Sequence, residues 1–339
     1  MKAIVFTETG KFEYTDYPEP QLKKDDDVKF KIIAASICGT DVHLLSNPPG
    51  IVGTPGIVLG HECVGEVVEV GTDVISLAIG DRIIFDNNVP CGVCPACQTG
   101  NSNLCQNMGS MGVFEDGVFA QYAVAPERQM VKIPLDIPLD QAIFAEPLNC
   151  VMGAIKKLKV MPGDNVLVLG GGPIGLYFTT LLKASGAGKV LVSEVSEFRT
   201  KYAYQQGANR VIHPLTENLV EVIKNETNGQ GVDIVIDAVG VLLADAIKAV
   251  KRGGSILLFG QNDKARQEIS QGDIVSRGLT IYGNFIGHYT LYNVAKLLNS
   301  GIVDFSPMIT HRLALSDFGI GLDAMRKGVA LEVVLDPWA

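Results

Sequence analysis

Six short apolar runs between residues 149 and 286 constrain the fold more than any other feature of the chain. They are "NVLVLG", "KVLVSEV", "RVIH", "VDIVIDAVG", "SILLFG" and "LTIYGNF". Stretches such as "PIGLYFTTLLKASG" and "LLADAIKAVK" lie between them and have helical spacing. Strands that are apolar on both faces are typical of a parallel sheet covered by helices on both sides. The pattern therefore predicts a doubly wound α/β domain over residues 149–286.

A glycine-rich loop follows the first of these strands. Gly170, Gly172 and Gly175 have G-x-G-x-x-G spacing and stand between a strand and a helix, which is the context this motif requires. The glycines allow a tight turn and let the backbone approach a pyrophosphate. Pro173 and Ile174 open the helix, whose N-terminus offers unpaired N–H groups to phosphates. The loop predicts that the domain binds a dinucleotide of the NAD type.

The choice between NAD and NADP depends on Glu194 and Arg199. Glu194 ends the second strand, in "LVSEV". A carboxylate there can accept hydrogen bonds from both hydroxyls of an adenosine ribose and would repel a 2′-phosphate, which favours NAD. Arg199 lies on the following helix and gives the alternative, because an arginine can bind a 2′-phosphate.

The first 148 residues have a different pattern. In "DDVKFKIIAASIC" the apolar Val28, Phe30 and Ile32 alternate with Lys29 and Lys31, which predicts a half-buried strand with its lysines in solvent. Glycine and proline punctuate the region, as in "SNPPGIVGTPG". We expect a mostly antiparallel β domain with long loops, and we expect the tail from about residue 287 to pack back onto it.

The charge and the N-terminus limit the compartment and the partners. The formal net charge is −9, which argues against general binding to nucleic acid or to anionic membranes. The first residues contain no apolar stretch followed by a small-residue cleavage site, and no long apolar run suggests a membrane span. We therefore expect a cytoplasmic protein with reduced thiols.

Four of the seven cysteines fall between Cys91 and Cys105, in "CGVCPACQTGNSNLC". Their spacing, C-x2-C-x2-C-x7-C, can surround one tetrahedral Zn²⁺ with thiolates from Cys91, Cys94, Cys97 and Cys105. Such a site has no open position, so it would stabilise a loop. An iron–sulfur cluster is the chemical alternative, and disulfides are disfavoured in a reducing compartment.

A second set of possible metal ligands is of mixed chemistry. "ASICGTDVH" contains Cys38, "VLGHECVGEV" contains His61 and Glu62, and "FAEPLNC" contains Glu146. Thiolate, imidazole and carboxylate ligands that leave one position open are typical of a catalytic zinc. Each residue alone has an ordinary structural explanation, and their joint occurrence carries the prediction.

With these motifs, almost the whole chain resembles the zinc-dependent medium-chain alcohol and polyol dehydrogenases, and the pattern is most similar to sorbitol, threonine and butanediol dehydrogenases. The matching motifs are "CGTDVH", "GHE", the four-cysteine segment, "EPL" and "GGGPIG". The resemblance implies a GroES-like catalytic domain over residues 1–148, completed by 287–339. A Rossmann dinucleotide-binding domain over residues 149–286 would lie between them in sequence.

The resemblance also implies roles for individual residues. The catalytic zinc would be held by Cys38, His61 and a carboxylate from Glu62 or Glu146, and a second, structural zinc would be held by the four-cysteine segment. Thr40 would take the proton of the substrate hydroxyl, and His43 would pass it to solvent.

The implied reaction is transfer of hydride from a secondary alcohol to NAD⁺, which gives a ketone and NADH. The loop "LLSNPPGIVGTPG" offers Ser46, Asn47 and Thr54 but no cation for a substrate carboxylate. We therefore expect a polyol or sugar alcohol, with L-threonine or 2,3-butanediol as the alternative. A zinc-free quinone reductase and a non-catalytic NAD-binding structural protein are two further hypotheses. The intact ligand sets argue against both.

The remaining cysteines and histidines have weaker signals. Cys63 and Cys150 match no ligand position, and we expect both to be core thiols. His288 follows the sixth strand and is a candidate contact for substrate or cofactor. The sixth strand itself is expected at the sheet edge, where an unpaired strand can bind a second copy. The resemblance implies a homodimer or homotetramer.

Overall fold

The chain forms two compact units. The computed structural model describes all 339 residues. One unit contains Met1–Cys150 and Gly287–Ala339, and the other contains Val151–Ile286. The chain therefore leaves the first unit after Cys150 and returns to it at Gly287. The first of these boundaries lies two residues beyond the 148/149 division expected from the sequence.

The unit formed by Val151–Ile286 is built on a six-stranded parallel sheet, as the apolar runs predict. Its strands are β10 (Asn165–Leu169), β11 (Lys189–Ser193), β12 (Arg210–Ile212), β13 (Val232–Asp237), β14 (Val250–Leu258) and β15 (Thr280–Gly283). Their order in the sheet is β12-β11-β10-β13-β14-β15. This is the doubly wound order in which the chain reverses direction beside the first strand, so β10 and its loop lie at the switch point.

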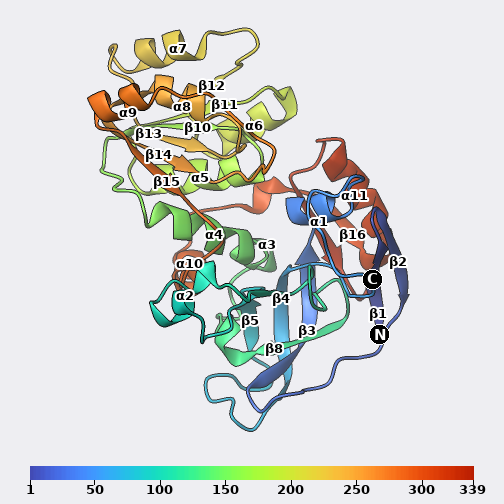
Figure 1. The fold of residues 1–339 in the computed structure, drawn as a ribbon. Coiled ribbons are helices and arrows are strands. Elements are labelled where there is room, and N and C mark those ends of the chain that lie inside the picture. The colour runs from blue at the N-terminus through green and yellow to red at the C-terminus, as the bar shows by residue number, and fades with distance from the viewer. The chain divides into compact units, whose positions relative to one another are not determined.

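Helices cover both sides of this sheet (Figure 1). They are α5 (Pro173–Ala184), α6 (Glu197–Gln205), α7 (Leu219–Glu226), α8 (Leu243–Ala249) and α9 (Gln271–Arg277). The central strands are buried on both faces, and Leu167, Val235 and Ile256 are fully covered in the core. β15 lies at the sheet edge as expected; pairing with a second copy stays a prediction.

The other unit is built on a seven-stranded sheet. Six strands follow the order β16-β17-β3-β4-β5-β9, and β8 also pairs with β3. The strands are β3 (Asp27–Ser36), β4 (Glu62–Val70), β5 (Arg82–Phe85), β8 (Tyr122–Pro126), β9 (Met130–Lys132), β16 (Ile309–Ala314) and β17 (Glu332–Asp336). All pairs are antiparallel except β16 with β17. The tail after Gly287 therefore completes this sheet.

Smaller elements complete this unit. The short strand pairs are β1 (Lys2–Glu8) with β2 (Lys11–Asp16), and β6 (Asn88–Val89) with β7 (Gly109–Ser110). The helices are α1 (Gly39–Leu44), α2 (Pro95–Gln98), α3 (Leu139–Ala142), α4 (Ala145–Ile155), α10 (Leu291–Ser300) and α11 (Phe318–Arg326). α4 begins in this unit and ends in the other, because the division falls after Cys150.

β3 is more buried than its alternating sequence predicts. Lys29, expected in solvent, is only 7% exposed, because β8 pairs with this half of β3. Its ammonium group lies 2.6 Å from Glu19 Oε1 and over the ring of Tyr122. The aliphatic part of the lysine is thus covered while its charge is paired.

No helix of the structure is both long enough and apolar enough to span a membrane.

The tight approach within the glycine loop gives a test of this fold. A Cβ atom at Gly175 would lie 1.9 Å from the backbone oxygen of Gly170, where no flexible side chain can move aside. We expect Gly175→Ala to lower the free energy of unfolding by about 1–3 kcal/mol, the usual cost of overpacking. Urea denaturation of the wild type and the variant measures this difference in the free energy of unfolding. Gly272→Ala, an exposed helical position, is the control and should cost nothing; equal stability of the two variants would contradict the packing argument.

Candidate active site and metal centres

The four predicted cysteines meet in one group. Their sulfur atoms all lie within 4.8 Å of one another, and none forms a disulfide. Cys94 Sγ is 3.6 Å from Cys97 Sγ and 3.9 Å from Cys105 Sγ. Four sulfurs around a zinc at about 2.3 Å would be separated by about 3.8 Å, so the group fits a tetrahedral Zn²⁺.

Backbone N–H groups prepare this cluster for negative charge. The N–H groups of Cys91 and Asn107 both donate to Cys105 Sγ at 3.3 Å. Backbone N–H groups of Cys97 and Gln106 lower the pKa of Cys94 to about 6, so this thiol is readily ionised. Burial instead raises the pKa of Cys97 to about 12, and a bound cation would be needed to ionise it.

A second group joins the thiol of Cys38, the ring of His61 and the carboxylate of Glu62. Their ligand atoms also lie within 4.8 Å of one another. Cys38 caps the N-terminus of α1, whereas His61 and Glu62 stand at the start of β4. Glu62 pairs in register with Ser36 on β3, and Ser36 Oγ donates to Glu62 Oε2 at 2.6 Å. Sheet pairing and a short helix thus hold three donors of different chemistry together.

Asp41 and Thr40 support this group from α1. Asp41 Oδ2 accepts a hydrogen bond from the Cys38 backbone N–H at 2.9 Å, and its Oδ1 lies 3.8 Å from His61 Nδ1. The two atoms are too far apart for a hydrogen bond, and both are buried without another partner. An aspartate on the Nδ1 side leaves Nε2 of His61 for a metal. The backbone N–H and the hydroxyl of Thr40 partly oppose the rise of the Cys38 pKa. Thr40 therefore lies beside a candidate ligand.

The electrostatics of the group fit a divalent cation. Burial, together with the charges of Asp41 and Glu146, raises the pKa of Cys38 to about 12. Burial also raises the pKa of Glu62, with Cys38 and Glu332 adding to the effect. Burial opposes charge on the His61 ring, but the surrounding carboxylates raise its pKa overall. Buried acids without a cation are costly, and a metal ion of charge +2 would stabilise their ionised forms.

Glu146 lies near this group but outside its three closest donors. It is 7% exposed, and burial raises its pKa to about 7, while the charge of His61 opposes the shift. Cys150, four residues later on α4, has its Sγ 3.7 Å from Glu146 Oε1. The prediction that Cys150 is a core thiol is met only in part: the residue is half-buried, and burial raises the pKa of its thiol well above the ordinary value. Cys63 is a core thiol, as expected.

A polar network anchors the part of α4 that carries these two residues. The side chain of Asn149 is fully buried and donates to Asp86 Oδ2 at 2.8 Å. Thr290 Oγ1 lies 2.7 Å from Asn149 Oδ1 and 2.8 Å from its backbone oxygen, and it can donate to either. A Cβ at Gly287 would collide with the Asn149 amide, so the chain passes close by there. The orientation of α4 in this unit therefore depends on Asp86 and Thr290.

Two histidines considered as site residues, His43 and His288, lie outside both groups of metal donors. His43 is exposed in the last turn of α1, and its ring lies near Gly50 in the following loop. His288 Nε2 lies 2.6 Å from the backbone oxygen of Gly100, in the turn between Cys97 and Cys105. The structure thus gives His288 a contact with the four-cysteine segment. The alternative of a substrate or cofactor contact finds no support in its hydrogen bonding.

The glycine loop and Glu194 form one hydrogen-bonded unit. Gly172 caps α5, with Pro173 as its first residue, and Gly170 has φ of 97°, a value that favours glycine. Glu194 is buried, and its Oε2 accepts from the N–H of Gly171 at 2.7 Å. Its Oε1 accepts from the N–H groups of Val195 and Ser196 at 2.8 Å. Arg199 lies close to Gly172, so carboxylate and guanidinium both border the loop.

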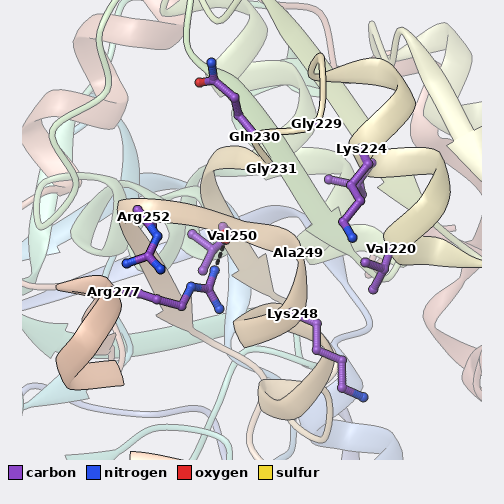
Figure 2. Close-up of a pocket in the computed structure, with 11 residues that line it drawn as sticks. Val220, Lys224, Gly229, Gln230, Gly231, Lys248, Ala249, Val250, Arg252 and Arg277 are labelled. Carbon is purple, nitrogen blue, oxygen red and sulfur yellow. Dashed lines mark hydrogen bonds between the residues drawn. The ribbon is translucent and has the colours of Figure 1, made fainter. Parts of the chain in front are cut away.

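A hollow of about 210 Å³ in the same unit is unrelated to this loop. Figure 2 shows Lys224, Lys248, Arg252 and Arg277 among its lining residues. Three of these cations stand in the last turns of α7, α8 and α9, where positive charge favours the helix dipole. Arg277 donates to the backbone oxygens of Ile247 and Val250. These contacts give Arg277 a structural role at the amino end of β14.

Three acids near the second group, Asp41, Asp86 and Glu332, were not predicted from the sequence. Asp41 had a local signal, because it stands three residues after Cys38 at a helix start. Asp86 and Glu332 had none. They reach the site through sheet pairing and chain return, which their own neighbours in sequence do not reveal.

Comparison with known proteins identifies the family. The model of the family described as "Alcohol dehydrogenase GroES-like domain" matches residues 24–135, and that described as "Zinc-binding dehydrogenase" matches residues 173–300. A parallel sheet with the strand order of dinucleotide-binding domains, together with two groups of residues that can bind zinc, defines a class of metal-dependent oxidoreductases. The chain belongs to the zinc-dependent medium-chain alcohol dehydrogenase family.

The relatives cover most or nearly all of the chain. An L-threonine 3-dehydrogenase from Caldanaerobacter subterraneus is 37% identical over 320 residues, which cover 92% of each protein. The structure of alcohol dehydrogenase TADH from Thermus sp. ATN1 superposes with a TM-score of 0.94 at 30% identity and covers 99% of both chains. That of 2R,3R-butanediol dehydrogenase from Bacillus subtilis has a TM-score of 0.91 at 27% identity, with 99% of both chains covered. This chain is therefore an enzyme of the oxidoreductase class.

We expect two zinc ions per chain, because two separate ligand groups are complete. Cys38→Ser should lose the catalytic zinc and turnover while keeping the fold. Cys97→Ser should lose the other zinc and lower thermal stability. Elemental analysis and thermal denaturation measure these effects, and Cys63→Ser is the control that should retain both ions. A wild type with one zinc or none would contradict the assignment.

We expect NAD to be preferred over NADP, because Glu194 places a buried negative charge beside the glycine loop. Glu194→Gln should lower the ratio of kcat/KM with NAD to kcat/KM with NADP by roughly tenfold, the equivalent of about 1.4 kcal/mol. Glu197→Gln removes the same charge from an exposed position nearby and should leave the ratio unchanged. Steady-state kinetics with both cofactors decides, and equal wild-type values would be evidence against the role of Glu194.

Proposed function

We propose that this enzyme oxidises a secondary alcohol whose adjacent carbon carries an oxygen or nitrogen substituent, with NAD⁺ as hydride acceptor. The observation that carries the proposal is the buried group of Cys38, His61 and Glu62, which joins thiolate, imidazole and carboxylate donors within 4.8 Å. The substituent is inferred from the substrates named for the relatives. L-threonine carries an amino group beside its 3-hydroxyl, and 2,3-butanediol carries a second hydroxyl.

Zinc held by Cys38, His61 and Glu62 would lower the pKa of the substrate hydroxyl, and the nicotinamide would accept hydride from the carbon. The protein residues supply the remaining functions. The carboxylate of Asp41 faces the Nδ1 side of the His61 ring at 3.8 Å, where its charge favours a proton on Nδ1 and leaves Nε2 for the metal. Ser36 holds one oxygen of Glu62, which limits how far that carboxylate can move.

The hydroxyl proton must leave a buried site, and Thr40 is the best placed acceptor. Its hydroxyl acts on the pKa of the Cys38 thiol, and Thr40 is the second residue after Cys38 at the start of α1. His43 is exposed on the same short helix. An imidazole exchanges protons near neutral pH, so His43 can deliver the proton to solvent.

Two substrate types compete within this class. The named relatives support L-threonine. The charges around the site support an uncharged diol or polyol, because Asp41, Glu146 and Glu332 surround the ligands and would repel a substrate carboxylate. The same acids would attract an ammonium group. An amino alcohol without a carboxylate combines the favourable features of both.

We expect a panel of alcohols to resolve these alternatives. NADH formation should be at least roughly tenfold more efficient, in kcat/KM, with 2,3-butanediol than with 2-butanol. The reason is that one hydrogen bond to a charged group contributes about 1.5 kcal/mol or more. L-Threonine, 1-amino-2-propanol and sorbitol then separate the carboxylate, the amine and the polyol chain. Equal efficiency with 2-butanol would contradict the proposed substrate class, and no NADH from any alcohol would contradict the reaction.

A further inference from the structure

Four cationic side chains from separate elements line the hollow of about 210 Å³ formed by residues of α7, α8, β14 and α9, which we call the cationic hollow (Figure 2). They are Lys224, Lys248, Arg252 and Arg277, and no acidic side chain is among the lining residues. The whole chain has a formal net charge of −9, so positive charge gathers here against the overall balance. A concave surface lined by one sign of charge attracts ligands of the opposite sign.

The cationic hollow and the glycine loop lie at opposite edges of the parallel sheet. Gly231, which lines the hollow, directly precedes β13, and Val250, which also lines it, begins β14. The glycine loop instead follows the carboxyl end of β10. Since β10, β13 and β14 run parallel, their amino and carboxyl ends face opposite edges. A ligand in the cationic hollow would therefore not share the space of the dinucleotide.

The ends of the surrounding helices do not neutralise these cations. Lys224, Lys248 and Arg277 stand in the last turns of α7, α8 and α9, where backbone carbonyl groups attract positive charge. Each helix end carries only about half a negative charge, so the three ends offset about one and a half of the four positive charges. Lys248 also pairs with Asp245 at 3.4 Å, whereas the other three, Arg252 included, form no ion pair. A surplus of positive charge therefore remains.

The cations also keep donor groups that no protein atom uses. Arg252 Nη1 donates to the backbone oxygen of Ser276 at 3.0 Å, and Arg277 donates to two backbone oxygens near the start of β14. These bonds use only part of the five N–H donors of each guanidinium, and they restrict its position, which lowers the entropy cost of binding a ligand. The exposed ammonium group of Lys224 makes no hydrogen bond. Arginine binds phosphate oxygens in pairs, and lysine adds a point charge.

We propose that the cationic hollow binds a small polyanion of the phosphate class. Arg252 and Arg277 bind its oxygens, and Lys224 and Lys248 add positive charge. The volume of the hollow suits a small anion, and the net charge of the chain disfavours a long polyanion such as a nucleic acid. This inference does not depend on the proposed reaction, because the catalytic metal donors belong to the other unit.

Isothermal titration calorimetry tests the proposal, with pyrophosphate added to the zinc-loaded enzyme at saturating NADH, so that the glycine loop is occupied. The double variant Lys224→Gln/Arg252→Gln should bind at least roughly tenfold more weakly than the wild type, because it loses two charge-assisted contacts. Lys264→Gln/Lys296→Gln removes the same charge from exposed positions outside the hollow and should bind like the wild type. Heat from pyrophosphate at zinc would be common to all three proteins, so their difference reports the hollow.

Two results would overturn the proposal: a wild type that does not bind pyrophosphate, or unchanged affinity in Lys224→Gln/Arg252→Gln. Orthophosphate carries less charge and should bind more weakly than pyrophosphate, and equal affinity would overturn the choice of a polyanion. Should the double variant fail to fold, Lys224→Gln alone gives the answer, because this ammonium group makes no hydrogen bond that the fold would lose. Weaker binding would support the site, and unchanged affinity would overturn it.

Discussion

The burial of several acids around one small volume is the constraint on which the rest of the catalytic unit depends. Cys38, Glu62, Asp41, Glu146 and Glu332 are half-buried or buried there, with His61 as their basic neighbour. Without a cation such a group opposes folding in its ionised form, because each charge loses its hydration and repels the others. A divalent ion reverses the balance. The β sheet can therefore be understood as a frame that brings β3, β4 and β17 together at the cost of crowding acids, with metal binding as the compensation.

The two metal groups differ in how they are organised, and the difference follows from their chain topology. The four-cysteine group is local: all its ligands fall within one segment, and backbone N–H groups of that segment already stabilise negative sulfur. The catalytic group is assembled from two separate segments, with Cys38 at the start of α1 and His61 and Glu62 at the start of β4. A local group can form early and hold its loop, whereas the catalytic group exists only when β3 and β4 have paired.

Much of this could be predicted from sequence, for physical reasons that also explain the failures. The parallel sheet was visible because strands buried on both faces have continuous apolar runs, as in β10 and β13. The four-cysteine group was visible because its ligands are close in sequence. Lys29 was misjudged, because its burial depends on β8, a neighbouring strand that the local sequence does not show. Cys150 is half-buried beside Glu146, and this contact is not visible in the sequence pattern either. The positions of Asp86 and Glu332 near the site were not predicted for the same reason.

The insertion of one unit within the other has a consequence for biosynthesis. β17 pairs with β3, so residues near the two ends of the chain must meet before the catalytic sheet is complete. The intervening unit, Val151–Ile286, is continuous in sequence and has local strand order around β10 and β11. It can therefore fold while the ribosome is still producing the tail. The sheet of the first unit stays incomplete until β17 has been synthesised, although Cys38, His61 and Glu62 are already part of the chain. Late closure of this kind keeps the catalytic ligands from forming their final site until the nucleotide-binding unit has been made.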